Sequence, residues 1–207
     1  MASFESDVSI GGDLRVVGDI TPAKAKSEIL AIAELAAFNV PVTSWRTHDA
    51  MGTNLPGAAA NDDLGLVGGT LGTGHPSLQA GDIGGASSTR YARALVTLPA
   101  EYVAGQTVKL RFYAACLTSA PDTTCTLDIV AYKIDGDNTV SADLAAAAEA
   151  NNIKTTVFDN VDFTITSTSL SPGDDLDVRV GITYADTGNL AVMTPVIGKT
   201  QLLCDVR

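Results

Sequence analysis

Apolar and polar residues alternate strictly along much of the chain after residue 90. In the clearest stretch, Val108, Leu110 and Phe112 alternate with Lys109 and Arg111. The same alternation recurs in residues 126–132, 161–166 and 176–184, and a last apolar segment covers residues 196–206. This pattern is typical of strands that bury one face. The sequences DGDN (135–138) and SPGD (171–174) lie between these segments and predict tight turns.

Two further strands are expected before residue 90, near residues 42–46 and 64–67. They bring the expected total to about eight, which suits two packed antiparallel sheets of the jelly-roll type. An immunoglobulin-like sandwich, with about seven strands, is the alternative. Trp45 is the only tryptophan of the chain, and we expect it to anchor the core.

The N-terminal residues follow other patterns. Residues 1–22 hold short apolar pieces around Gly-Gly and Gly-Asp turns and predict an extended arm. Residues 23–39 carry apolar residues near helical period before Pro41 and predict one short helix. Residues 50–89 are dense in glycine and predict a long loop within a sandwich domain of residues 40–207. The predicted fold is thus all-β, an antiparallel jelly-roll sandwich with an N-terminal arm and a single helix.

The charge balance excludes several partners. The chain has 13 Lys and Arg against 24 Asp and Glu, a net charge of -11, which repels nucleic acid and anionic membranes. No stretch approaches the ~18 apolar residues of a membrane span. The N-terminus lacks the basic and apolar regions of a signal peptide, so we expect synthesis in a cytoplasm without export by that route.

Few residues offer catalytic chemistry. The only histidines are His48 and His75. His48 is followed by Asp49, a potential base and orienting acid, but the nearby hydroxyls of Ser44 and Thr47 lie in no nucleophile motif. Phosphate-loop and zinc motifs are absent from the sequence. We therefore expect no catalytic residue, no bound metal and no cofactor, and a protein that is not an enzyme.

Two weaker chemical possibilities remain at this stage. Asp135 and Asp137 begin like a calcium loop, although the glycine and glutamate expected later in such a loop are missing. A tight hairpin turn explains them better. The cysteines Cys116, Cys125 and Cys204 have no metal-ligand spacing, and we expect buried free thiols.

Two longer segments resemble virion proteins of tailed bacteriophages. LVTLPAEYVAGQTVKLRFYAACLTSAPDTTCTLDIVAYKID (95–135) and FTITSTSLSPGDDLDVRVGITYAD (163–186) carry this resemblance, and the arm sequence SIGGDLRVVGDIT is similar to short β-repeats of phage fibres. The resemblance implies a capsid decoration, or cement, protein. It further implies a homotrimer on the capsid exterior whose partner is the major capsid protein.

On this interpretation the arm, the helix and the Gly-rich loop supply the contacts with partners. The residues expected to bind partners are Leu14, Val16, Ile20, Ile29, Leu30, Arg90 and Arg93. Arg90 and Arg93, with Lys109 and Arg111, are also candidates for one basic patch on two adjacent strands. The alternative function is a fibre domain or a module that binds host-surface carbohydrate, for which Tyr113, Tyr132 and Tyr184 are the aromatic candidates. A hydrolase ranks last.

Overall fold

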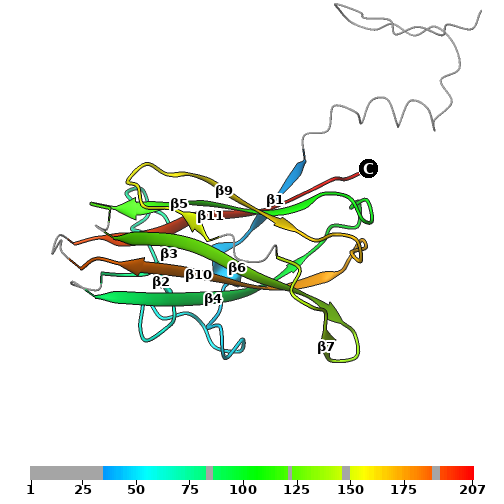
Figure 1. The fold of residues 1–207 in the computed structure, drawn as a ribbon, viewed down its shortest axis with the longest axis horizontal. Helices are drawn as coiled ribbons and strands as arrows, with labels where there is room; N and C mark the ends of the chain where they lie inside the picture. The colour runs from blue at the N-terminus through cyan, green and yellow to red at the C-terminus, as the bar shows by residue number, and fades with distance from the viewer. Residues whose placement is uncertain (1–34, 83–85, 121–122, 146–149, 188–191) are drawn as a thin grey trace, which may run out of the picture. The chain divides into compact units, whose positions relative to one another are not determined.

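The computed structural model describes residues 35–82, 86–120, 123–145, 150–187 and 192–207 (Figure 1). The predicted arm lies outside these ranges. So do five of the residues expected to bind partners: Leu14, Val16, Ile20, Ile29 and Leu30. The described residues belong to one compact unit that begins at Glu34. No helix among them is long and apolar enough to cross a membrane.

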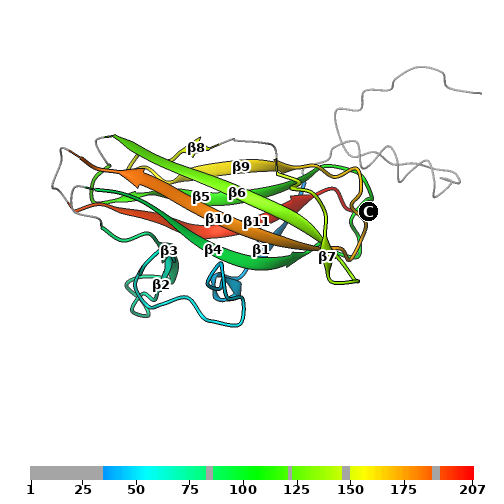
Figure 2. The same ribbon diagram turned by 60° about the horizontal axis from the view of Figure 1, so that its bottom comes forward.

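Two antiparallel sheets face each other, as Figures 1 and 2 show. The first has the order β2 (Gly65–Val67), β3 (Ser77–Gln79), β11 (Thr194–Cys204), β5 (Val108–Leu117) and β9 (Asp159–Ile165), with β1 (Ala36–Val40) also paired to β11. The second has the order β4 (Ser87–Thr97), β10 (Asp175–Ala185), β6 (Thr124–Asp135) and β7 (Thr139–Val140), with β8 (Asn151–Asn152) paired to β6. The predicted all-β antiparallel sandwich is confirmed.

The core lies between the sheets and follows the alternation of the sequence. Val108, Leu110 and Phe112 of β5 are fully buried and face the apolar side chains of the second sheet. Trp45 is 1% exposed, and its ring centroid lies 6.2 Å from that of Phe112. Phe112 in turn meets Phe163 edge-on at 5.8 Å, a favoured geometry for aromatic rings. The prediction that Trp45 anchors the core is confirmed.

The predicted helix over residues 23–39 is wrong where the structure describes it. Ala36–Val40 form the strand β1, in register with Cys204–Thr200 of β11. The backbone hydrogen bonds of this long-range pairing override the local helical period. The strand expected near residues 42–46 is also wrong, because Val42–Ser44 form one 3-10 turn and Arg46 makes only an isolated bridge.

The Gly-rich segment 50–89 is more ordered than predicted. It contains the expected short strand β2 and also β3, which the sequence analysis missed. The turn at residues 171–174 is confirmed, with Gly173 at φ +80°, a conformation that favours glycine. The three cysteines are buried and free, as predicted.

Candidate functional site

The outer face of the β4–β10–β6 sheet carries an ordered set of polar and aromatic side chains. The strand registers place Tyr91 beside Gly181, and place Arg179 between Arg93 and Val130. The next row toward the end of β6 holds Leu95, Asp177 and Tyr132. Residues opposite one another in an antiparallel pair share a face, so these rows form one continuous surface.

Arg93 and Asp177 form a two-point ion pair on this surface. The Nε atom of Arg93 donates to Oδ1 of Asp177 at 2.6 Å, and Nη2 of Arg93 donates to Oδ2. Asp177 is 8% exposed, whereas the Arg93 side chain is 33% exposed. The pair fixes a planar arrangement of donors and acceptors, and one edge of it reaches solvent.

A second guanidinium lies directly opposite Arg93. Two like charges in register on neighbouring strands are unfavourable. Arg179 is held by another contact: its Cζ atom lies 4.8 Å from the ring centroid of Tyr91. The ring of Tyr91 sits directly over Gly181, where an added Cβ atom would come within 2.9 Å of Cε1 of the ring. Glycine at 181 therefore allows the ring to lie flat against the sheet.

The segment 46–64 forms a wall beside this face, and Figure 2 shows it next to β4. Arg46 and Arg93 exchange backbone hydrogen bonds of 2.8 and 3.0 Å. The backbone N–H of Tyr91 donates to Asp62, and the N–H of Leu64 donates to Tyr91. These bonds satisfy the outer edge of β4 and place the side chain of His48 over the sheet.

His48 lies between two carboxylates and against an aromatic ring. Its Nδ1 is 3.4 Å from Oδ1 of Asp63, its Nε2 is 3.5 Å from Oδ2 of Asp62, and its ring centroid is 4.8 Å from that of Tyr91. One potential ligand atom from each of these three residues lies within 4.8 Å of the others, close enough for one divalent cation to contact all three. The two carboxylates, however, contact different ring nitrogens. Their clearest effect is to hold the imidazole in one orientation.

Together these elements enclose a groove of about 330 Å³. Its lining residues are His48, Arg93, Val130, Tyr132, Val140, Asp177 and Arg179. Val140, in the β6–β7 hairpin, closes the end opposite the His48 wall. A cavity of this size with a few convergent polar groups on an apolar floor has the general character of a small-ligand site.

The four basic residues that the sequence suggested as one patch lie on two different sheets. Arg90 and Arg93 lie on β4, whereas Lys109 and Arg111 lie on β5 of the other sheet, so these four candidates do not form a single basic patch. Arg93 is paired with Asp177 and Arg111 with Asp162, and Arg90 donates to the backbone carbonyl of Ala80. Strand order is set by long-range pairing, which local alternation does not encode.

The three tyrosines considered for carbohydrate binding also lie in different parts of the structure. Of the three tyrosines, Tyr132 lines the groove, Tyr113 lies on the opposite sheet, and Tyr184 is fully buried with its hydroxyl donating to Ala80. His48 contacts Asp62 and Asp63, rather than its sequence neighbour Asp49, which was considered as an orienting acid but not favoured.

Of the two hydroxyls near His48 in the sequence, those of Ser44 and Thr47, the second is engaged by the backbone. Thr47 is buried and donates to the carbonyl of Ala50. Among the described residues, the group that could hold a cation contains neither Asp135 nor Asp137. Asp137 instead accepts hydrogen bonds from Thr139, as in a hairpin turn.

Three residues of this sheet face were not singled out from the sequence: two line the groove, and the third, Tyr91, contacts Arg179 beside it. Asp177, Arg179 and Tyr91 all occupy outward positions of alternating strands, so the pattern predicts that they are at least partly exposed. Their meeting depends on β10 lying between β4 and β6. That order is visible only in the fold.

No protein-family model matches this chain, and no curated protein matches it. Similar solved structures include the CBM22-1 xylan-binding domain from Paenibacillus barcinonensis Xyn10C, at 12% identity and a TM-score of 0.40 over 84% of this chain and 100% of that one. The xylan-binding module CBM15 matches at 12% identity and a TM-score of 0.41 over 84% and 99%. The family 22 module of Clostridium thermocellum Xyn10B matches at 15% identity and a TM-score of 0.39 over 81% and 90%.

These likenesses lie in the β-sandwich and say nothing of what this chain binds. No phage capsid protein is evident among the matches, so the predicted relationship to phage decoration proteins gains no support.

Proposed function

We propose that this chain is a non-catalytic binding module whose groove on the β4–β10–β6 sheet holds a neutral carbohydrate. The observation that carries the proposal is the row of Tyr132 beside the Arg93–Asp177 pair on the floor of the groove. This row places an apolar ring face next to planar, charge-assisted hydrogen-bonding groups.

Such a combination suits a sugar. A pyranose ring presents C–H groups on its faces and hydroxyl groups around its rim, and each hydroxyl both donates and accepts hydrogen bonds. Tyr132 and Val130 supply the apolar floor, while Arg93, Asp177 and Arg179 supply donors and an acceptor. A ligand with only donors or only acceptors would leave part of this set unpaired.

The local charges favour a ligand without net charge. Each cation of the floor has a partner: Arg93 pairs with Asp177, and Arg179 lies over the ring of Tyr91. The carboxylates of Asp62 and Asp63 flank His48 at the wall. An anionic ligand would meet these acids, and a cationic ligand would meet the two guanidinium groups.

Affinity gel electrophoresis tests the proposal with uncharged polysaccharides as probes: arabinoxylan free of glucuronic acid, galactan, mannan and mixed-linkage β-glucan. The native protein is expected to be retarded by at least one of them. Tyr132→Ala should abolish that retardation, because it removes the half-buried aromatic ring that lines the floor. Tyr113→Ala, on the other sheet, is the matched control and should migrate as the native protein does. The proposal fails if none of the polysaccharides retards the native protein, or if both variants behave alike.

A structural role in a virion is a second candidate, and one feature of the fold favours it. The strand β1 pairs with β11 along one edge and with no described strand along the other, and its Phe38 is 37% exposed. An open edge of this kind can accept a strand from another chain. Residues 1–34 precede this edge directly in the sequence.

The oligomeric state distinguishes the two candidates. A decoration protein is expected to form a homotrimer that binds assembled capsids, so native mass spectrometry should give three copies. A lysine at position 38 should disrupt that assembly, because it places a charge on the edge strand. A monomer unaffected by Phe38→Lys counts against this second role. That the chain is not an enzyme stays a prediction.

A further inference from the structure

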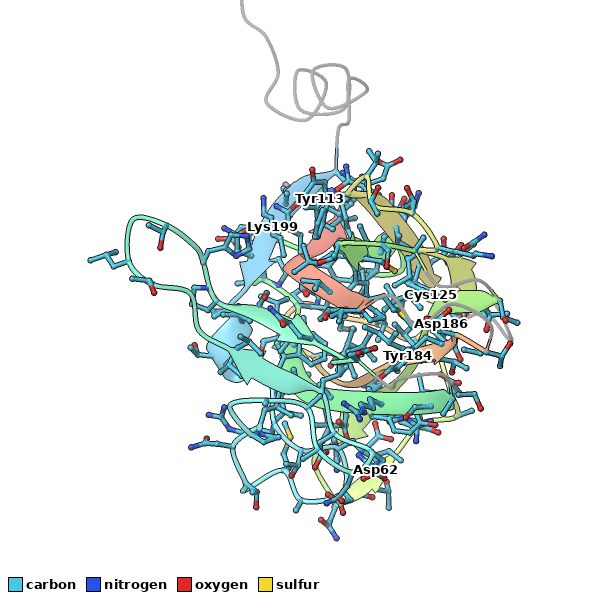
Figure 3. The ribbon with its side chains drawn as sticks, turned by 90° about the vertical axis from the view of Figure 1, so that its left-hand side faces the viewer. Asp62, Tyr113, Cys125, Tyr184, Asp186 and Lys199 are labelled. Atoms are coloured by element: carbon cyan, nitrogen blue, oxygen red, sulfur yellow. The ribbon has the colours of Figure 1, made fainter. Side chains whose placement is uncertain are left out.

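The outer face of the other sheet bears an aromatic pair that the groove does not use. The ring centroids of Tyr113, on β5, and Phe158, just before β9, lie 5.4 Å apart with 32° between the ring planes. Tyr113 is 42% exposed. Figure 3 shows Tyr113 together with Lys199 on one side of the sandwich, and Asp62 of the groove wall on the opposite side.

The strand register brings a cation to this pair. Lys199 of β11 is the cross-strand partner of Tyr113, so the two side chains share the outer face. The side chain of Lys199 is exposed and makes no hydrogen bond or ion pair with any residue that the structure describes. His75 completes the lining of a hollow of about 410 Å³ formed with Tyr113, Phe158, Gly198 and Lys199.

A bulge in β11 shapes the floor of this hollow. The register between β11 and β5 shifts between Ile197 and Lys199, which leaves Gly198 as the extra residue. A Cβ atom at Gly198 would lie 3.4 Å from Cε1 of His75 and 3.8 Å from Cε1 of Phe158. Both rings therefore pack close to the backbone of the bulge, and glycine leaves the space between them open.

The charge of the hollow is opposite to that of the protein. The chain has a net charge of -11, yet none of the carboxylates that the structure describes lines this site. The neighbouring Asp159 is in register with the inward-facing Ala114, so its side chain starts from the other side of β9. Asp162 is occupied by Arg111 at 2.6 Å. The Lys199 ammonium, which has no partner among the described residues, can attract an anion, and the neighbouring rings of Tyr113 and Phe158 can pack against an apolar face of that anion.

His75 adds a directed polar group. Its Nδ1 lies 3.0 Å from the carbonyl oxygen of Pro76. A carbonyl only accepts, so Nδ1 carries the hydrogen and Nε2 is left to accept a hydrogen bond from a ligand hydroxyl. The site thus offers a flat apolar platform, a cation and a hydroxyl acceptor.

We propose that Tyr113, Phe158, His75 and Lys199 form a second binding site, which takes a sugar residue bearing a carboxylate. The sugar ring stacks on the aromatic pair, its carboxylate pairs with the Lys199 ammonium, and one hydroxyl donates to His75. This site lies on a different sheet from the groove, so the two proposals can succeed or fail independently.

Isothermal titration calorimetry with trigalacturonate tests this site, and the methyl ester of trigalacturonate serves as the uncharged match. We expect the acid to bind and the ester to bind at least tenfold more weakly. Lys199→Gln should weaken binding of the acid at least tenfold, with little effect on folding because the residue is exposed. Binding of the acid should also weaken as salt is raised from about 0.05 to 0.5 M, since an exposed ion pair is screened.

Two further variants locate the effect. Tyr113→Ala should lose binding of the acid, and circular dichroism melting checks that it folds. Tyr132→Ala, in the groove, should bind trigalacturonate as the native protein does. The proposal is overturned if the native protein does not bind trigalacturonate at 10 mM. A dissociation constant of that size corresponds to a binding free energy of only ~3 kcal/mol. The proposal is equally overturned if acid and ester bind alike, if Lys199→Gln keeps full affinity, or if hexa-aspartate binds as tightly as the sugar.

Discussion

The guanidinium of Arg93 and the carboxylate of Asp177 meet edge to edge on the floor of the groove and are joined by two hydrogen bonds. Asp177 is buried and Arg93 is partly exposed, so the pair links the sheet to the surface that a ligand would touch. Each strand contributes one partner, β4 the arginine and β10 the aspartate. The pair therefore stabilises the sheet and orients the donors of the groove at the same time.

Asp177→Asn tests how much the ion pair contributes to the stability of the sheet. The substitution removes the charge that balances a partly buried guanidinium, and we expect the free energy of unfolding to fall by about 2 kcal/mol. Urea denaturation measures this change. Asp128→Asn, exposed on the same face of the sheet but on β6, is the control and should change stability by less than about 0.5 kcal/mol. Equal stability of the two variants would contradict the role given to the pair.

Gly181→Ala tests how the Tyr91 ring is seated. A Cβ atom at 181 would come within 2.9 Å of the ring, so the ring must move away from the sheet. We expect stability to change by less than about 1 kcal/mol, because the part-exposed ring can move away and alanine is itself favoured over glycine within a strand. Loss of the Arg179 stack should also reduce polysaccharide binding. Gly136→Ala meets nothing within 4 Å and should leave both properties unchanged.

The ion pair between Arg111 and Asp162 predicts a pH dependence of stability. Hydrogen bonding to Arg111, opposed in part by burial, lowers the pKa of Asp162 below its ordinary value. A group with a depressed pKa in the folded state contributes stability that is present above the unfolded value of about 3.9 and is lost as the pH falls through the folded pKa.

Comparison with Asp162→Asn isolates this contribution. At pH 7 the native protein should be more stable than the variant by about 1 kcal/mol, the usual size for a partly exposed pair. The difference should shrink below about pH 4 and vanish in stronger acid. Urea melts of both proteins between pH 2 and 7 measure it. A difference that stays constant across this range would show that the ion pair is not its source.

The cysteines are expected to be inert thiols in the folded protein. Burial raises the pKa of Cys204 to about 11, and the contact with Cys116, together with burial, raises the pKa of Cys125. The same contact lowers the pKa of Cys116, but this thiol is 1% exposed and therefore shielded from reagents. The thiolate is the reactive form, so labelling at pH 8 should be slow. Ellman's reagent should report no rapid reaction in the native state and all three thiols after unfolding in denaturant. Recovery of a single thiol would show instead that Cys116 and Cys125, whose sulfur atoms lie 3.6 Å apart, had formed a disulfide.

The sequence predicted much of the sandwich because the buried faces of β5, β6 and β10 alternate so regularly. Leu110, Leu127 and Val180 all face the core, as their period requires. The apolar residues of segment 36–40 suit a helix locally, which is why a helix was predicted there. The strand that pairs with this segment, β11, follows about 160 residues later in the chain.

The candidate site was less accessible from sequence. Tyr132 and Arg93 were both singled out, but for different functions, since nothing local shows that β10 separates their strands. For His48 the sequence suggested only its neighbour Asp49 as a partner, whereas the fold brings Asp62 and Asp63 to it. A polar site on a sheet face is assembled by strand order, and strand order is a long-range property.

The most direct test of the groove is a ¹H–¹⁵N correlation titration of the native protein with xylohexaose, mannohexaose and galactotetraose. At least one of these neutral oligosaccharides should shift the backbone amides of Arg93, Val130, Tyr132 and Arg179, and leave the amides of Tyr113 and Lys199 in place. The absence of any shift at millimolar sugar, or shifts confined to the opposite sheet, would contradict the proposal that this groove binds carbohydrate.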